Sequence, residues 1–111
     1  MKKIIIINGP NLNLLGEREV ELYGTKTLKE IEKECCEIFK KDKLSLNFFQ
    51  SNSESEIIDK IHICKNYDGM IINAAAFTHN SVAIRDSLDI FKKPIIEVHI
   101  CLLYTSDASD E

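Results

Sequence analysis

The stretch Ile4-Ile5-Ile6-Ile7, which Asn8-Gly9-Pro10 follows, decides the fold of this 111-residue sequence. Four consecutive β-branched residues are typical of a strand that is buried on both faces, as in a parallel sheet covered by helices on either side. The run ends after four residues at a turn signal, so it is neither an export signal nor a membrane span. The start of the chain therefore predicts the first strand of an α/β domain.

Helices and strands alternate along the rest of the chain. Capping boxes at 27–30 and 53–56 each open a helix, the first about fourteen residues long. Further strands are predicted at 44–49, 69–73 and 94–99, a third helix at 81–91, and loops at 11–24 and 74–79. The apolar sets expected to face the core are Leu28, Ile31, Cys35, Ile38 and Phe39, then Ile57, Ile58, Ile61 and Cys64, then Ile84, Leu88 and Phe91. This order predicts a parallel sheet wound on both faces with right-handed crossovers.

The composition argues against several functions. The net charge is −4, from 18 acidic and 14 basic residues. It does not indicate the excess of positive charge that binds nucleic acid or an anionic membrane. The four cysteines lack the C-x-x-C spacing of a zinc site, so we expect reduced thiols in a cytoplasmic protein. Gly9-Pro10 matches neither a dinucleotide fingerprint nor a phosphate loop, so these motifs give no support to a nucleotide cofactor.

Polar side chains follow the carboxyl ends of the predicted strands, which share one edge of a parallel sheet, where ligands bind. They are Asn8, Asn11, Asn13, Arg18, Tyr23, Asn73, Thr78, His79, Glu97 and His99. Asparagines also suit turns, His79 could cap a helix, and Glu97 and His99 could be structural partners on one face of a strand. Together, a phenol, a guanidinium and two imidazoles suit acid–base work on a polyhydroxylated anion better than metal hydrolysis.

Three blocks of the sequence resemble the type II 3-dehydroquinate dehydratases. They are 8–18 with 22–24, 72–86, and 95–100. The resemblance implies a flavodoxin-like fold over residues 1–101, a three-layer α/β/α domain with four strands present of an expected five. It also implies a hydro-lyase that removes water from 3-dehydroquinate by anti elimination through an enolate, giving 3-dehydroshikimate in the shikimate pathway to chorismate and aromatic amino acids. The reaction in this family uses no cofactor and no metal.

The resemblance also implies roles for individual residues. Tyr23 would be the general base, Arg18 would stabilise its phenolate, and His99 would be the general acid. Glu97 would orient His99, and Asn11 would bind the enolate oxygen together with an ordered water. Substrate-binding residues would be Asn73, His79, Asp86, Ile100 and Cys101, with Asp86 acting across a subunit contact. Family members are homododecamers, so we expect a cytoplasmic homo-oligomer that binds a small-molecule substrate, no nucleic acid and no membrane.

The chain departs from the family pattern at two places. Ala74-Ala75 stands where many members have Pro-Gly. Cys101-Leu102 replaces Ser-Asn, and residues 102–111 resemble no family segment, so we expect a foreign or unpacked tail on a chain without the family's last strand and helix. Activity of such a chain is expected to be weak or absent. Two alternatives stay open: a non-catalytic flavodoxin-like binding or assembly module with a vestigial site, and a mononucleotide or flavin binder on the same fold.

Overall fold

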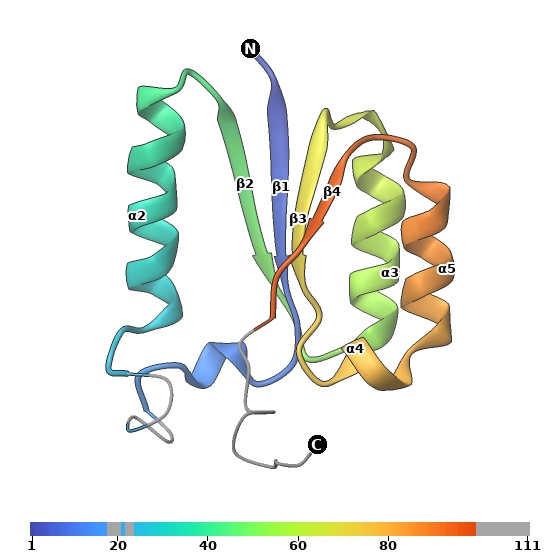
Figure 1. Cartoon of the computed structure of the whole chain (residues 1–111), viewed down its shortest axis with the longest axis horizontal. Helices are drawn as coiled ribbons and strands as arrows, with labels where there is room; N and C mark the ends of the chain where they lie inside the picture. Colours follow the sequence, from blue (N-terminus) through green and yellow to red (C-terminus); the bar gives the residue numbers. More distant parts are fainter. Residues whose placement is uncertain (18–20, 22–23, 100–111) are drawn as a thin grey trace.

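Four parallel strands form a single sheet in the computed structural model, which describes residues 1–17, 21 and 24–99 (Figure 1). The strands are β1 (Lys3–Asn8), β2 (Ser45–Gln50), β3 (Gly69–Asn73) and β4 (Ile95–Glu97). Their order across the sheet is β2-β1-β3-β4, with every neighbouring pair parallel. The predicted parallel sheet is therefore confirmed, although β4 is shorter than the predicted 94–99.

Helices cover both faces of the sheet, as predicted. Figure 1 shows α2 (Leu28–Lys41) on one side and α3 (Glu54–Ile63) with α5 (Val82–Ile90) on the other. The described residues also contain three shorter helices: η1 (Leu12–Leu14), η2 (Cys64–Asn66) and α4 (Phe77–Asn80). Within the described ranges, no helix is long and apolar enough to cross a membrane. The result is a doubly wound, three-layer α/β/α fold.

The main core lies between β1, β3 and the pair α3 and α5. Ile5 and Ile7 are completely buried, and Ile6 on the opposite face of β1 is only 7% exposed, which confirms a strand buried on both faces. The buried residues of this cluster are Ile5, Ile7, Ile57, Ile61, Cys64, Met70, Ile72, Ile84, Leu88 and Phe91. Burial raises the pKa of the Cys64 thiol, which favours its neutral form.

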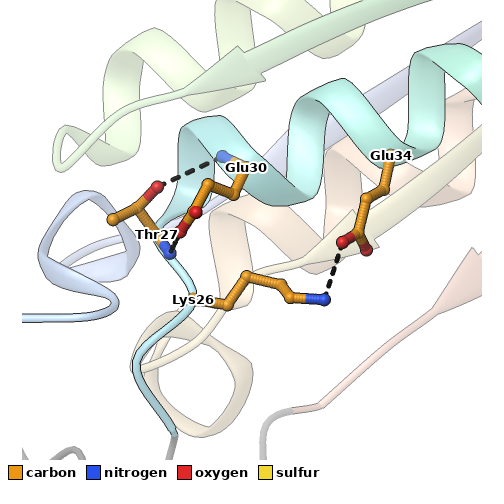
Figure 2. Close-up of polar contacts among 4 residues, drawn as sticks. All are labelled: Lys26, Thr27, Glu30 and Glu34. Atoms are coloured by element: carbon orange, nitrogen blue, oxygen red, sulfur yellow. Dashed lines mark hydrogen bonds and ion pairs between the residues drawn. The ribbon is translucent and has the colours of Figure 1, made fainter.

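The first turn of α2 carries the predicted capping box (Figure 2). The Glu30 backbone N–H donates to Thr27 Oγ1 at 3.2 Å, and the Thr27 N–H donates to Glu30 Oε1 at 2.8 Å. Lys26, one residue earlier, pairs with Glu34 at 2.7 Å between Nζ and Oε2. The two hydrogen bonds of the capping box satisfy backbone donors at the start of the helix that have no intrahelical partners, so α2 begins where the local sequence predicts.

The packing of α2 differs from the prediction at Ile38. No residue of α2 is buried, and Ile38 is 58% exposed although its spacing predicted an inward position. The cause is the position of the helix, which packs chiefly against β2 at the edge of the sheet (Figure 1). A helix over an edge strand has a narrow buried face, so periodicity alone overestimated its width.

The N-terminus of α3 is a capped end, but the second predicted capping box is incomplete. Ser53 Oγ accepts from the Glu56 N–H at 3.3 Å, as predicted. The Glu56 carboxylate, however, accepts from Ser51 Oγ at 2.5 Å, and the Ser53 N–H donates to Ser51 Oγ at 2.9 Å. The buried Ser51 hydroxyl therefore stands between Glu56 and the backbone group that a complete box would bind directly.

Two short helices lie in stretches predicted as loops. η1 follows β1, and its neighbourhood is anchored by the buried side chains of Leu12 and Leu15. α4 follows β3 and leads directly to Ser81, which caps α5 by accepting from the Ile84 N–H at 2.9 Å. Both helices are too short for a hydrophobic period to reveal them.

We expect acid to destabilise the fold partly through Glu30 and Asp68. Hydrogen bonds from Thr27 hold the pKa of Glu30 below its ordinary 4.5, and the Lys3 N–H, donating to Asp68 at 2.8 Å, holds the pKa of Asp68 below 3.8. A depressed folded-state pKa contributes stability above the unfolded-state pKa that is lost as the pH falls through the folded-state value. Urea unfolding between about pH 6 and pH 3 should therefore show less acid loss in the double variant Glu30→Gln, Asp68→Asn than in the unmodified chain. Equal losses in both would contradict the expectation.

Candidate active site

The carboxyl ends of β1 and β3 form the centre of the candidate site. Asn8 and Asn73 are opposed at the last position of the β1–β3 ladder, and both are buried. Asn8 Nδ2 donates to the Phe49 carbonyl at 3.3 Å, and Asn73 Oδ1 accepts from the Ala75 N–H at 3.2 Å. In the strand order β2-β1-β3-β4, this junction is the point where successive crossovers leave to opposite faces, the usual ligand site of such sheets.

Gly9 brings the loops after β1 and β3 into contact. Its N–H donates to the Asn73 carbonyl at 2.8 Å. A Cβ atom at this position would lie 2.5 Å from the Ala74 carbonyl oxygen and 2.7 Å from its carbon. Only glycine allows two backbones to approach so closely, so this residue fixes the spacing between the two loops that carry Asn11 and His79.

Asn11 stands at the start of η1 with its backbone in the left-handed region, at φ 68°. Its side chain is exposed, and its N–H donates to Asn52 Oδ1 at 2.9 Å. Asparagine tolerates this backbone region better than most residues. The side chain is therefore presented at the same sheet edge as Asn73 by a backbone that is held in place.

The β4 side of the site is a pocket between β4 and α5. It is lined by Ile72, Ala74, Phe77, Ser81, Ile84, Arg85, Leu88, Glu97 and His99. Arg85 Nη1 lies 3.6 Å from Glu97 Oε2, and both side chains are about half exposed. In the part of the chain that the structure describes, Glu97 pairs with Arg85 and has no hydrogen bond to His99, and its role in orienting His99 stays a prediction.

The structure places the predicted site residues in three groups. Asn11, Asn73, Glu97 and His99 lie at the carboxyl edge of the sheet, and Asp86 is exposed on α5. His79 lies on the backbone of α4, at the same edge. Arg18, Tyr23, Ile100 and Cys101 lie outside the described residues. Over residues 1–17, 21 and 24–99, no three His, Cys, Asp or Glu side chains gather closely enough to hold a metal ion.

Sequence reasoning missed several polar residues of this edge. Ser81 Oγ donates to the Glu54 carboxylate and so ties the start of α5 to the start of α3. Gln50, the last residue of β2, and Asn52, two residues after it, bond the loop after β1. The signal for the last two was present, because polar residues that follow a strand end lie at the same edge as the other candidates.

The fold and the site define a doubly wound α/β protein with amide, imidazole and carboxylate groups at its switch point. The family model for class II dehydroquinase matches residues 2–108, and the chain belongs to this family. Family members are hydro-lyases. The predicted resemblance is thereby confirmed.

Individual relatives agree with the family. The chain is 50% identical over 108 residues to a 3-dehydroquinate dehydratase of Prochlorococcus marinus strain MIT 9215, covering 96% of this chain and 74% of the relative. It is 52% identical over 101 residues to a catabolic 3-dehydroquinase of Talaromyces marneffei, covering 90% of this chain and 58% of that relative. The crystal structure of a type II dehydroquinase from Butyrivibrio crossotus superposes with a TM-score of 0.86 at 42% identity, covering 88% of this chain and 70% of that one.

Ala75 is a strained position at this edge, and we expect Ala75→Gly to stabilise the fold by about 0.5–1 kcal/mol. Its φ of 53° lies in the left-handed region that glycine adopts at little cost. Urea unfolding measures the change. Ala76→Gly is the matched control, because Ala76 has φ −60° and should lose about 0.5–1 kcal/mol on the same exchange. A less stable Ala75→Gly variant would contradict the strain at this position.

Proposed function

We propose that this chain is a 3-dehydroquinate dehydratase that converts 3-dehydroquinate to 3-dehydroshikimate and water. The observation that carries the proposal is the family match over residues 2–108, which includes every block of the candidate site. In the proposed reaction a base removes a proton from the carbon beside the ketone, and the electron pair forms an enolate. The enolate then expels the hydroxyl group from the neighbouring carbon as an acid protonates it, so that one water leaves.

We assign the base to Tyr23 and its activation to Arg18. A free phenol has a pKa near 10, so it needs a neighbouring positive charge to ionise at neutral pH. Arg18 is five residues earlier in the same loop. Its guanidinium would stabilise the Tyr23 phenolate and the charge that develops in the transition state.

We assign the acid to His99 and the orienting role to Glu97. Both residues line the pocket beside β4, and their spacing of two along the chain favours one face of the sheet. The Arg85–Glu97 pair at 3.6 Å is exposed, and such pairs contribute less than about 1 kcal/mol. Glu97 can therefore exchange Arg85 for the His99 imidazole when substrate binds.

Substrate hydroxyls and the carboxylate are assigned to Asn73, His79 and the backbone at residues 100–101, with Asn11 receiving the enolate oxygen. Asn73 supports this assignment best. Its Oδ1 is occupied by the Ala75 N–H, while its Nδ2 has no hydrogen-bond partner among the residues that the structure describes. The amide nitrogen of a buried side chain at the sheet edge is thus available to donate to a substrate oxygen.

We propose that the chain forms homo-oligomers, up to a dodecamer, through the outer face of α5. Val82, Asp86 and Ile90 follow one another at intervals of four, and Val82 and Ile90 are 83% and 59% exposed. An apolar stripe around a carboxylate would place Asp86 toward a neighbouring subunit. Sedimentation of the double variant Val82→Lys, Ile90→Lys should show smaller species, whereas Ile38→Lys, an exposed apolar residue on α2, should not.

We place the protein in the cytoplasm and in the shikimate pathway. Cys35, Cys36 and Cys64 are free thiols, as suits a reducing compartment. One of the two relatives above is named a catabolic 3-dehydroquinase, so the biosynthetic role needs a test of its own. The test is whether the protein restores growth of a dehydratase-deficient bacterium without aromatic amino acids. Failure to restore growth by an active protein would contradict it.

The direct test of activity is the rise of enone absorbance with 3-dehydroquinate. The assay compares this chain with an extended chain, in which the C-terminal part of the Prochlorococcus relative follows residue 100 in place of residues 101–111. We expect turnover in the extended chain and weaker turnover in this chain. Substrate binding without turnover in both would favour the non-catalytic module instead. Absence of binding in both would contradict the proposed function.

A further inference from the structure

A bracket of hydrogen bonds joins the end of β2 to the start of the loop after β1. Asn52 Oδ1 accepts from the Asn11 N–H at 2.9 Å and from Gln50 Nε2 at 3.1 Å. Gln50 Nε2 also donates to the Gly9 carbonyl at 3.1 Å. The Ser51 N–H donates to the Asn8 carbonyl at 3.0 Å, which continues the ladder between the two segments. The two amide side chains thus bind both backbone groups that flank Pro10.

The bracket holds Asn11 in the left-handed backbone region, which asparagine tolerates but which non-glycine residues seldom adopt. A non-glycine residue in the left-handed region persists when its surroundings over-determine it. Here the Asn11 N–H is bound by Asn52, and its carbonyl accepts from the Leu14 N–H at 3.0 Å. With both backbone groups occupied, the direction of the Asn11 Cα–Cβ bond is set by the loop after β2.

Gly9 connects this bracket to the rest of the site. Its N–H donates to the Asn73 carbonyl on β3, and its carbonyl accepts from Gln50, the last residue of β2. The segment from Gly9 to Asn11 is therefore fixed from both neighbouring strands. A displacement at the end of β2 would therefore move Asn11, although Gln50 and Asn52 are assigned no contact with substrate.

We propose that Gln50 and Asn52 are positioning residues that hold Asn11 where it stabilises the enolate. The proposal rests on the proposed function, because the role of Asn11 belongs to that reaction. Neither Gln50 nor Asn52 is assigned any contact with substrate. Their effect should appear in kcat, since an interaction made mainly in the transition state lowers kcat and kcat/KM together when it is lost.

The experiment combines amide exchange at the Asn11 N–H, measured by NMR, with kinetics in this chain and in the extended chain. Asn52→Ala should speed exchange about threefold to tenfold and lower kcat about 10- to 100-fold, with KM changed less than about threefold. Asn52→Asp keeps an acceptor oxygen and should restore both. Asn47→Ala is the matched control, because it removes a β2 amide whose hydrogen bond among the described residues is to Tyr67 Oη, at 3.0 Å, and it should change neither.

A double variant separates positioning from general loss of structure. If Asn52 acts through Asn11, Asn11→Ala combined with Asn52→Ala should lose no more kcat than Asn11→Ala alone. Multiplied losses would overturn the proposal, as would unchanged exchange in Asn52→Ala or faster exchange with normal kcat. If neither unmodified chain turns over, the proposed function fails and the catalytic role of the bracket fails with it. Exchange at Asn11 would then still decide whether the bracket holds this residue.

Discussion

Tyr23→Phe is expected to lower kcat by about 10²- to 10⁴-fold, the contribution typical of a positioned general base, and to leave the fold intact. The substitution removes the hydroxyl whose ionised form takes the proton in the proposed reaction. Arg18→Ala should lower kcat to a similar degree, because the phenolate would lose the charge that stabilises it. The rise of enone absorbance measures kcat, and circular dichroism with urea unfolding measures the fold.

Tyr67→Phe is the matched control for this prediction. The Tyr67 hydroxyl accepts from Asn47 Nδ2 at 3.0 Å ahead of β3, far along the strand from the site edge. Its loss should cost about 0.5–1.5 kcal/mol of stability and leave kcat unchanged. Near-normal turnover in Tyr23→Phe would refute the base assignment. An unfolded Tyr23→Phe variant would indicate that Tyr23 has a structural role instead.

Gly9→Ala is expected to destabilise the fold by about 3 kcal/mol or more, at the upper end of overpacking substitutions, and to abolish turnover. The added Cβ would lie 2.5 Å from a backbone oxygen and 2.7 Å from a backbone carbon of Ala74. No side-chain rotation relieves such a contact, so the loops after β1 and β3 must separate. Separation would break the Gly9 to Asn73 hydrogen bond and move Asn11 away from the other site residues.

Gly69→Ala is the comparison for this variant. Gly69 is also buried, but its added Cβ would meet the end of the flexible Ile4 side chain, 3.1 Å away. We expect a cost below about 1.5 kcal/mol and normal kcat. Urea unfolding of both variants gives the difference. Equal stability of Gly9→Ala and Gly69→Ala would show that the two loops are not held at the spacing described.

The sequence predicts the parts of the fold that depend on neighbouring residues. The bounds of α2 follow from Thr27 and Glu30, and β3 follows from an apolar run between loop residues. The exposure of Ile38 could not be predicted in this way, because it depends on which strand the helix covers. Glu56 likewise bonds Ser51 rather than the cap residue for a tertiary reason, the burial of the Ser51 hydroxyl beneath the helix end.

The sequence predicts at which edge of the sheet the site lies, but it does not predict the contacts within the site. Parallel topology was sufficient to bring Asn11, Asn73 and His99 to one side of the sheet. The pairing of Arg85 with Glu97 depends on where α5 packs relative to β4, which the pattern of residues along the chain does not specify. The roles of Tyr23 and Arg18 came from the family resemblance and stay predictions.

Because no residue of α2 is buried, we expect this helix to resist proteolysis less than the sheet and the helices α3 and α5 do. α3 and α5 contribute five buried residues, four of them in the hydrophobic core, whereas α2 contributes none. Local opening costs least where few apolar contacts are lost, so α2 can detach while the sheet and the opposite helix layer stay folded. A protease that cleaves after lysine would meet Lys29, Lys33, Lys40 and Lys41 during such openings. The site edge, which is built on the loops after β1 and β3, would stay folded after α2 has been cleaved.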